Sequence, residues 1–333
     1  MHRFFLALMF GVVFVMAGVL AAASSRPLWA YGYNAPPPPA GTPAPTAAPA
    51  APAAPEVARS IPGSTKSFKR SEIYARYQLA DWLPDAHAPM PDIVMKGKEA
   101  QGVYACSFCH LPHGRGRPEN APVSGLPVSY FVKTMMDFKN GDRKSSDERK
   151  RNAGLMVAFA KAMTEAEMKA AAEYFGAIPW KPLWVKVKET SRVPTTHIDN
   201  NLFIPNEGSA TEPIGKRIVE VPENDDLSEA LRDPRSGFIA YVPPGSIKRG
   251  QSLVTTGGGG KTVRCGDCHG ADLKGMGPVP GIAGRSPSYL IRQLYDMQVD
   301  ARKGEWAQLM KPVVAKLTED DLIAIGAYVA SIQ

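Results

Sequence analysis

The pattern of apolar and polar residues divides the chain into an apolar start, a Pro/Ala-rich stretch and two regions with helical spacing. The start is a run from Phe4 to Ala23 that contains no charged residue. Apolar residues spaced four and three positions apart then predict two amphipathic helices, one at Phe131, Met135 and Phe138 and one at Leu290, Leu294 and Met297. The chain is therefore expected to be mainly all-α.

A further helix is predicted late in each region by a threonine that precedes acidic residues, at Thr164-Glu165-Ala166-Glu167 and at Thr318-Glu319-Asp320-Asp321. Both segments resemble a capping box, in which the hydroxyl and the acidic side chain satisfy free N–H groups at the start of a helix. A helix is also predicted over Ile93 to Tyr104.

The segment from Lys181 to Gly245 lacks helical spacing and contains eight prolines. Three short runs in it favour strands, at Trp184 to Val187, Arg217 to Val221 and Phe238 to Val242. A connection of this length is rarely a bare linker in a compact protein. We therefore expect an irregular, Pro-rich segment with short strands that packs over one or both helical regions.

The apolar start has two interpretations. A run of about 20 apolar residues after a short positive segment is long enough to cross a bilayer, and it exceeds the usual ~7–15-residue centre of a signal peptide. An uncleaved membrane anchor is therefore favoured, although Ala21 and Ala23 would suit cleavage after Ala23. Either interpretation predicts export. The following run from Ala35 to Pro55 is almost only Pro and Ala and predicts a semi-rigid spacer.

Length and charge narrow the class of protein. A chain of 333 residues suits two domains of ordinary size. The net charge of +7 is not accompanied by a basic helix or an aromatic-interleaved basic patch, so we expect no nucleic acid. One basic stretch does occur, and it predicts a solvated loop or a docking surface for an acidic partner: Lys139, Arg143, Lys144, Arg149, Lys150 and Arg151.

The four cysteines of the chain form two motifs with the same spacing, Cys106-Ser107-Phe108-Cys109-His110 and Cys265-Gly266-Asp267-Cys268-His269. Two thiols three residues apart with a histidine directly after them are typical of covalent haem c attachment, in which the thiols bind the porphyrin and the imidazole binds the iron. A redox dithiol, a disulfide or a Cys-four zinc site would leave both histidines unexplained. We therefore predict two covalently bound haem c groups.

The two motifs begin an internal repeat with an offset of 159 residues, which carries Ser129-Tyr130 onto Ser288-Tyr289. This repeat helps to identify the second iron ligand, which is often a methionine sulfur in electron-transfer haems. Only Met310 lies between the second Ser-Tyr helix and the end of the chain, and it stands eight residues before a capping threonine. Met156 stands at the same place in the first copy, in loop or first-turn sequence. We therefore predict His110, Met156, His269 and Met310 as iron ligands.

Tandem His-Met haem motifs, a Ser-Tyr helix after each, and a Met-bearing segment before a terminal helix resemble the dihaem cytochrome c4 family of class I c-type cytochromes. The resemblance covers about residues 90 to 180 and 245 to 333. It implies two small all-helical domains related by a pseudo-twofold axis, which exchange electrons with redox partner proteins outside the cytoplasm. The apolar start, the Gly-rich insertion from Thr255 to Gly260 and the long central segment depart from the family.

The expected division of the chain is a signal peptide or membrane anchor (1–23), a Pro/Ala-rich spacer (24–64), a first cytochrome c domain (65–180), an irregular connecting segment (181–245) and a second cytochrome c domain (246–333). The expected function is single-electron transfer between respiratory partners on the periplasmic side of the bacterial inner membrane, with the protein anchored or released. Its partners would be a membrane-bound reductase, oxidase or dehydrogenase. The alternatives are a peroxidase-like or thiosulfate-oxidising haem enzyme and a cytochrome subunit of a membrane dehydrogenase complex.

Several other residues are weaker candidates. His87, His113 and His197 are candidates for a replacement ligand or a partner contact, with a surface or structural role favoured for each. Pro122 and Pro280 follow the two motif histidines by 12 and 11 residues, where a backbone carbonyl can accept a hydrogen bond from the imidazole.

Overall fold

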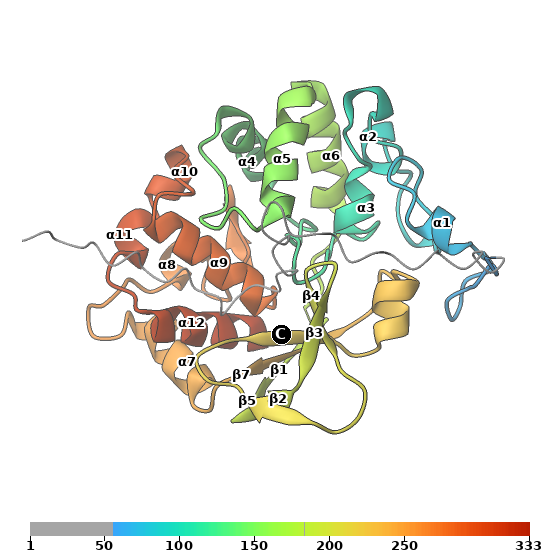
Figure 1. Ribbon diagram of the computed structural model, residues 1–333. Coiled ribbons are helices and arrows are strands. Elements are labelled where there is room, and N and C mark those ends of the chain that lie inside the picture. The colour runs from blue at the N-terminus through green and yellow to red at the C-terminus, as the bar shows by residue number, and fades with distance from the viewer. Residues whose placement is uncertain (1–55, 183) are drawn as a thin grey trace, which may run out of the picture.

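The computed structural model describes residues 56–182 and 184–333 (Figure 1). Two groups of helices lie side by side in the view of Figure 1, and a region of short strands lies below the first group and beside α7 (Ser246–Thr256) and α12 (Glu319–Ser331) of the second. Among the described residues, no helix has both the length and the apolar character needed to cross a membrane. The predicted apolar run at 4–23 lies outside the described residues.

The first group runs from the N-terminal segment to residue 177. Its elements are α1 (Arg70–Ile73), η2 (Pro84–Ala86), α2 (Asp92–Met95), η3 (Glu99–Gln101), α3 (Cys106–His110), α4 (Val128–Asn140), α5 (Arg151–Ala162) and α6 (Glu165–Ala177). The predicted amphipathic helix is confirmed as α4. Its apolar residues Phe131, Met135 and Phe138 are buried in one core with Met168 and Phe175 of α6.

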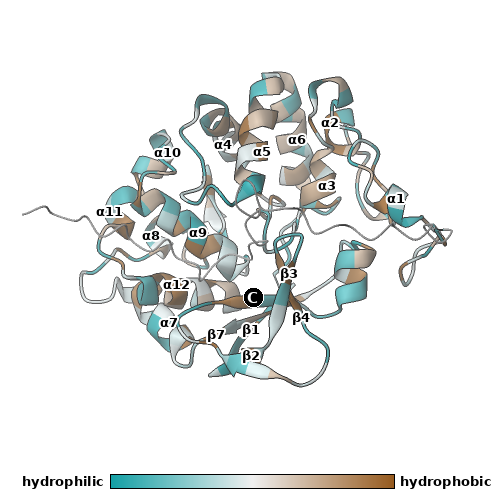
Figure 2. Cartoon of the chain, in the orientation of Figure 1, coloured by the Kyte–Doolittle hydropathy of each residue, from teal (hydrophilic) through white to brown (hydrophobic). Residues whose placement is uncertain are grey.

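The second group occupies the C-terminal part of the chain. Its elements are α7 (Ser246–Thr256), α8 (Gly266–His269), β8 (Gly275–Met276), β9 (Val279–Pro280), α9 (Pro287–Gln298), α10 (Glu305–Gln308), α11 (Lys311–Val314) and α12 (Glu319–Ser331). Helix α12 is the most apolar element of this group (Figure 2) and packs between α7 and α9. Gly250 allows α7 to approach closely, because a Cβ there would lie 1.9 Å from the Ala324 carbonyl of α12.

Both predicted capping boxes are present. The Glu167 N–H donates to the Thr164 hydroxyl at 3.2 Å, and the Thr164 N–H donates to the Glu167 carboxylate at 2.8 Å. Thr318 and Asp321 make the same pair of hydrogen bonds at the start of α12. The sequence therefore located the start of both final helices correctly.

The helix predicted over Ile93 to Tyr104 is wrong. Helix α2 ends at Met95 because the chain turns at Gly97, whose φ is +67°. A Cβ at this position would lie 2.3 Å from the Val103 carbonyl, so only glycine allows the turn. The turn pairs Lys98 with Val103 and leads directly into the first cysteine motif.

The connecting segment contains all three predicted strands, and they form one sheet. Strand β7 (Phe238–Val242) lies in the centre, parallel to β1 (Val185–Glu189) and antiparallel to β6 (Val219–Pro222). The pattern did not identify two short pairs, β2 (Arg192–Pro194) with β5 (Thr211–Pro213) and β3 (Thr196–Asp199) with β4 (Leu202–Pro205). These strands of three or four residues are too short for alternation to stand out.

The connecting segment packs on both helical groups, as expected. On the second group, the buried Glu220 of β6 accepts hydrogen bonds from the Ser286 hydroxyl at 2.9 Å and the Ser288 N–H at 3.2 Å. On the first group, the π-helical turn η4 (Asp226–Ala230) places Glu229 2.6 Å from Arg117. The segment therefore bridges the two groups rather than linking them loosely.

The predicted spacer ends earlier than residue 64. Arg59 pairs with Phe68 in an isolated β-bridge, and Ile61 is 2% exposed in a small core with Trp82 and Leu231. The spacer was extended too far because a single buried isoleucine between polar residues gives no periodic signal. The remaining domain boundaries stay predictions.

The Asp321 carboxylate at the start of α12 predicts acid-sensitive stability. Burial alone would raise its pKa, but Lys261, Thr318 and Arg249 together lower the pKa below its ordinary value of 3.8. A lowered pKa stabilises the fold above pH ~4, and this contribution is lost as the pH falls further. Asp321→Asn should reduce the free energy of unfolding by about 1.5–3 kcal/mol at pH 7 and by less at pH 3. Urea unfolding at the two pH values measures the difference.

A matched control is Asp320→Asn, because Asp320 is exposed and its ion pair with Lys216 spans 3.3 Å. This variant should change the free energy of unfolding by less than about 1 kcal/mol. An Asp321→Asn variant with the same acid sensitivity as the wild type would contradict the argument.

Candidate haem sites

The two motif histidines have the same hydrogen-bonding geometry. His110, at the end of α3, pairs through Nδ1 with the Ala121 carbonyl at 2.8 Å, and His269, at the end of α8, pairs with the Pro280 carbonyl at 2.8 Å. Both acceptors follow their histidine by 11 residues, so the prediction of Pro280 is confirmed and that of Pro122 is wrong by one residue. The repeat register of 159 residues holds at Ala121 and would have located it.

This geometry fixes the tautomer of both rings. A carbonyl oxygen only accepts, so Nδ1 must carry the proton, and Nε2 keeps a free lone pair. Burial lowers the pKa of His110 and His269, which favours the neutral form that a metal requires. Both imidazoles are therefore oriented as nitrogen ligands.

A cavity lies beside α3, with Cys109 and His110 on its wall and Met156 among its other lining residues. Most of its wall is apolar and comes from α4, α5 and the loop before α4: Val123, Leu126, Phe131, Met135, Phe138, Leu155 and Phe159. The first predicted histidine and the first predicted methionine thus line one mainly apolar cavity.

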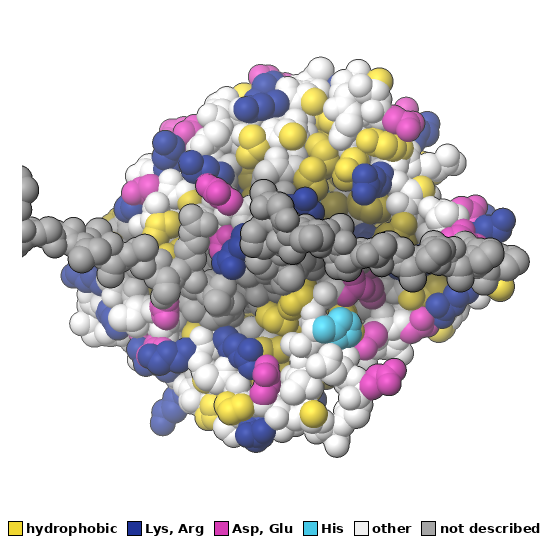
Figure 3. Space-filling view, viewed as in Figure 1, with side chains coloured by type: hydrophobic (Ala, Val, Ile, Leu, Met, Phe, Trp, Pro, Cys, Tyr) yellow, Lys and Arg dark blue, Asp and Glu magenta, His cyan; other side chains and the backbone are white. Residues whose placement is uncertain are grey.

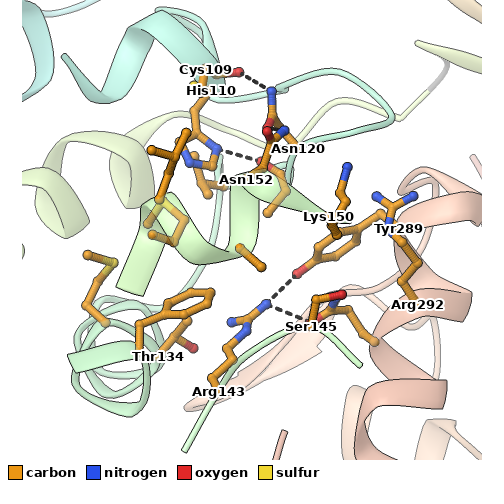
Figure 4. A pocket seen from close by; sticks show the side chains of 18 of the residues that line it. Cys109, His110, Asn120, Thr134, Arg143, Ser145, Lys150, Asn152, Tyr289 and Arg292 are labelled. Atoms are coloured by element: carbon orange, nitrogen blue, oxygen red, sulfur yellow. Dashed lines mark hydrogen bonds between the residues drawn. The ribbon is translucent and has the colours of Figure 1, made fainter. Parts of the chain in front are cut away.

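One side of the cavity is strongly basic. Arg143 and Lys150, from the loop between α4 and α5, and Arg292, from α9, gather there (Figure 4). Arg143 and Lys150 are only 6% and 8% exposed, so the expectation of a solvated loop or docking surface is wrong for both. Arg143 is buried because it packs against α9, where its guanidinium donates to Gln293 at 2.7 Å.

The walls of this cavity fit a haem. Apolar side chains suit the porphyrin, and buried cations suit its two carboxylates, because buried charges require partners. Burial and the nearby Arg292 lower the pKa of Lys150 well below the ordinary value, whereas the Glu119 carboxylate acts in the opposite direction. The basic side was missed in the sequence because Arg292 is far from the α4–α5 loop along the chain.

The two predicted methionines occupy different local structures. Met156 lies within α5 and not in a loop, whereas Met310 is the N-cap of α11. The difference follows from Pro312, which lacks an N–H and prevents α10 and α11 from forming one helix. Met310 and Cys265 are partly buried against the same C-terminal core.

A near-symmetric contact joins the two helical groups. The Arg302 guanidinium donates to the Tyr130 hydroxyl at 2.7 Å, and Arg143 donates to the Tyr289 hydroxyl at 3.3 Å. The Lys144 N–H donates to the Ala301 carbonyl at 2.9 Å, and the Lys303 N–H donates to the Asp142 carbonyl at 2.7 Å. Each of these pairs maps onto its counterpart by the 159-residue offset. Sequence reasoning missed the arginines, although the same offset relates them.

The other candidate histidines do not line the cavity around His110. His87 lies 3.2 Å from Asp81, and its ring centroid is 5.8 Å from that of His113. His197 is exposed and contacts Asn206 at 2.9 Å. All three therefore have structural or surface positions.

The thiols do not resemble reactive or zinc-binding thiolates. Burial raises the pKa of Cys106 to about 12 and that of Cys265 to about 11, whereas reactive cysteines have lowered values. Cys106 and Cys265 pack against separate cores. Within residues 56–182 and 184–333, no three His, Cys, Asp or Glu side chains are arranged to hold a metal ion.

Several known proteins are similar in sequence to this chain. No protein-family model matches the chain. The chain is 36% identical over 72 residues to cytochrome c-554(548) of Halomonas halodenitrificans, which covers 21% of this chain and 87% of the relative. It is 24% identical over 249 residues to cytochrome c4 of Azotobacter vinelandii, covering 73% of this chain and 90% of the relative.

A third relative is the thiosulfate dehydrogenase electron acceptor of Stutzerimonas stutzeri, 35% identical over 81 residues, 23% of this chain and 36% of that protein. The cytochrome c4 match spans most of the chain and most of the relative. The chain therefore belongs to the class I c-type cytochromes, as a dihaem member that resembles cytochrome c4 and carries two covalently bound haem c groups.

Proposed function

We propose that this protein transfers single electrons between redox partners on the periplasmic side of the membrane through two haems with His and Met ligands. The first haem site comprises Cys106, Cys109, His110 and Met156. The second haem site comprises Cys265, Cys268, His269 and Met310. The observation that carries the proposal is the apolar cavity lined by both His110 and Met156.

The roles of the side chains follow from their chemistry. Each bound haem supplies an iron that alternates between the ferrous and ferric states. In each site the carbonyl on Nδ1 would keep Nε2 directed to the iron and make the imidazole a stronger donor. The methionine sulfur would be a second ligand to the iron and would leave no coordination position for a substrate, which would favour electron transfer over catalysis.

The cavity walls would set the potential and hold the cofactor. Apolar side chains such as Phe131 and Phe138 exclude water, which favours the less charged ferrous state. Arg143, Lys150 and Arg292 would bind the haem carboxylates at the boundary between the two helical groups.

We propose protein partners rather than nucleic acid. On the face in Figure 3, Lys and Arg side chains are interspersed with Asp and Glu and do not gather into one basic patch. The Stutzerimonas relative is named as an electron acceptor of thiosulfate dehydrogenase, so an oxidoreductase of that type is a donor to test. Membrane attachment through residues 4–23 is part of the same proposal.

The test is spectroscopic. The full chain, produced with haem attachment, should contain two haems per polypeptide and show the methionine-sulfur-to-ferric-iron charge-transfer band at both. In a potentiometric titration, both haems should be reduced and reoxidised. In a separate test, neither haem should bind cyanide. A haem that lacks the band and binds cyanide tightly would instead indicate an enzyme with an open coordination position.

A further inference from the structure

The two cysteine motifs differ in how much of the chain covers them. In the first motif, Phe108 lies between the two cysteines, and the Arg232 guanidinium stands 4.8 Å from its ring and donates to its carbonyl. Arg232 comes from the connecting segment and is only 8% exposed. In the second motif, Asp267 takes the place of Phe108, and Cys268 is exposed.

Two segments outside the haem repeat build the cover over the first motif. We call residues 56–91 and 226–235 the cap. The Tyr74 hydroxyl donates to the Glu229 carboxylate at 2.9 Å, and the Trp82 indole donates to the Leu231 carbonyl at 2.8 Å. In Figure 1, η4 is the unlabelled yellow-orange helical turn, on the same side of the molecule as α1 and α3.

The cap is fixed to the first group by a buried ion pair. Arg117 contacts Glu229 of the cap at 2.6 Å and Glu119 of its own loop at 2.6 Å. All three residues are less than 10% exposed. Pairing of this kind is costly to open, because separation would leave buried charges without partners. The cap therefore stays closed over the first motif.

No described segment forms such a cap over the second motif. Instead, three apolar side chains are exposed on the segments that carry the second haem site, and we call them the open edge: Val263 (50% exposed), Met276 (55%) and Leu309 (74%). Neighbouring charges are paired with one another, Arg264 with Asp267 at 2.6 Å and Lys311 with Asp300 at 2.6 Å.

We infer that partner proteins exchange electrons with this protein only at the second haem site, and that the first site exchanges electrons only with the second. This inference rests on the proposed function. Electron transfer slows steeply with distance, so exchange occurs where the porphyrin edge lies nearest the surface. One electron leaves the reduced second site for the oxidised partner, and one electron from the first site then replaces it.

The open edge also defines the partner. It is a redox protein with an apolar contact face around its own metal centre, since the charges beside Val263 and Leu309 already neutralise one another. Such a contact depends little on long-range charge attraction. The rate of exchange should therefore change less than about threefold between low and moderate ionic strength.

The experiment mixes the fully reduced full-length protein with a ferric monohaem cytochrome c of higher potential in a stopped-flow instrument. Val263→Glu and Leu309→Glu place a charge on the open edge and should slow the oxidation of both haems at least tenfold. The matched control is Val57→Glu on the cap, where Val57 is 77% exposed, and its rates should stay within twofold of the wild type. Val263→Glu decides the result if Leu309→Glu disturbs the neighbouring Met310.

Slower oxidation of one haem in Val57→Glu would overturn the inference. An open-edge variant in which one haem is still oxidised at the wild-type rate would also overturn it. Either result would show two independent exchange sites. The haem content and the charge-transfer bands of the same samples test the proposed function separately. A protein with two haems and both charge-transfer bands, but with oxidation rates that contradict the inference, would refute the single exchange site and leave the proposed function intact.

Discussion

Met156→Ala should remove about half of the methionine-sulfur-to-ferric-iron charge-transfer absorbance, because one of two haems loses its sulfur ligand. Met310→Ala should remove the other half, and the double variant should show none. Each single variant should also gain one cyanide-binding haem and lower the reduction potential of that haem, since methionine ligation favours the ferrous state. Absorption spectra and potentiometric titration of the purified ferric protein measure all three effects.

The control for this prediction is Met163→Ala. Met163 is 4% exposed in the core of the first group and lies outside the cavity, so its loss should destabilise the fold by about 2–5 kcal/mol without changing the band. A full band in Met156→Ala would show that another residue binds the first iron. Because Met156 is within α5, the alanine variant keeps a good helix former at that position.

Arg117→Ala should reduce the free energy of unfolding by about 3–5 kcal/mol at pH 7, since it leaves the buried Glu119 and Glu229 without their cation. Burial alone would raise the pKa of Glu229, but Arg117, Tyr74 and Asn200 lower it below its ordinary value of 4.5. That stabilisation is present above pH ~4.5 and is lost as the pH falls. The difference in the free energy of unfolding between Arg117→Ala and the wild type should therefore become smaller as the pH falls.

Urea unfolding followed by far-UV circular dichroism at pH 7 and pH 4 tests this prediction. Lys186→Ala is a suitable control, because Lys186 forms an ion pair with Glu223 at 2.6 Å while remaining 59% exposed. Its effect should stay below about 1 kcal/mol. Equal effects of the two variants would mean that the buried pair does not fix the cap.

The repeat in the sequence predicted much of the architecture and the candidate sites. The 159-residue offset and the two capping boxes located α4, α6, α9 and α12, because these helices depend on local patterns that both copies share. Met156 was selected because it stands eight residues before the capping Thr164, as Met310 does before Thr318, and it lines one cavity with His110. The turn at Gly97 was missed, since nothing local distinguishes a glycine with positive φ from the helical Gly250.

Features that depend on contacts between distant segments could not be predicted. From the sequence, Lys150 is expected to be a solvated cation, but in the fold it is buried beside α9. The cap combines residues near position 74 with residues near 229, and neither segment carries a periodic signal. The three strands of the central sheet were identified from their β-branched and aromatic residues, but their order follows from pairings that only the folded chain shows.

The contact between the two helical groups uses equivalent residues from both sides, Tyr130 with Arg302 and Tyr289 with Arg143. Such reciprocal contacts are the mark of an isologous dimer, in which one surface patch is complementary to its own copy. The two groups thus have the geometry of a homodimer whose subunits have been joined in one polypeptide. The duplicated halves were then free to diverge, and the cap lies on only one of them.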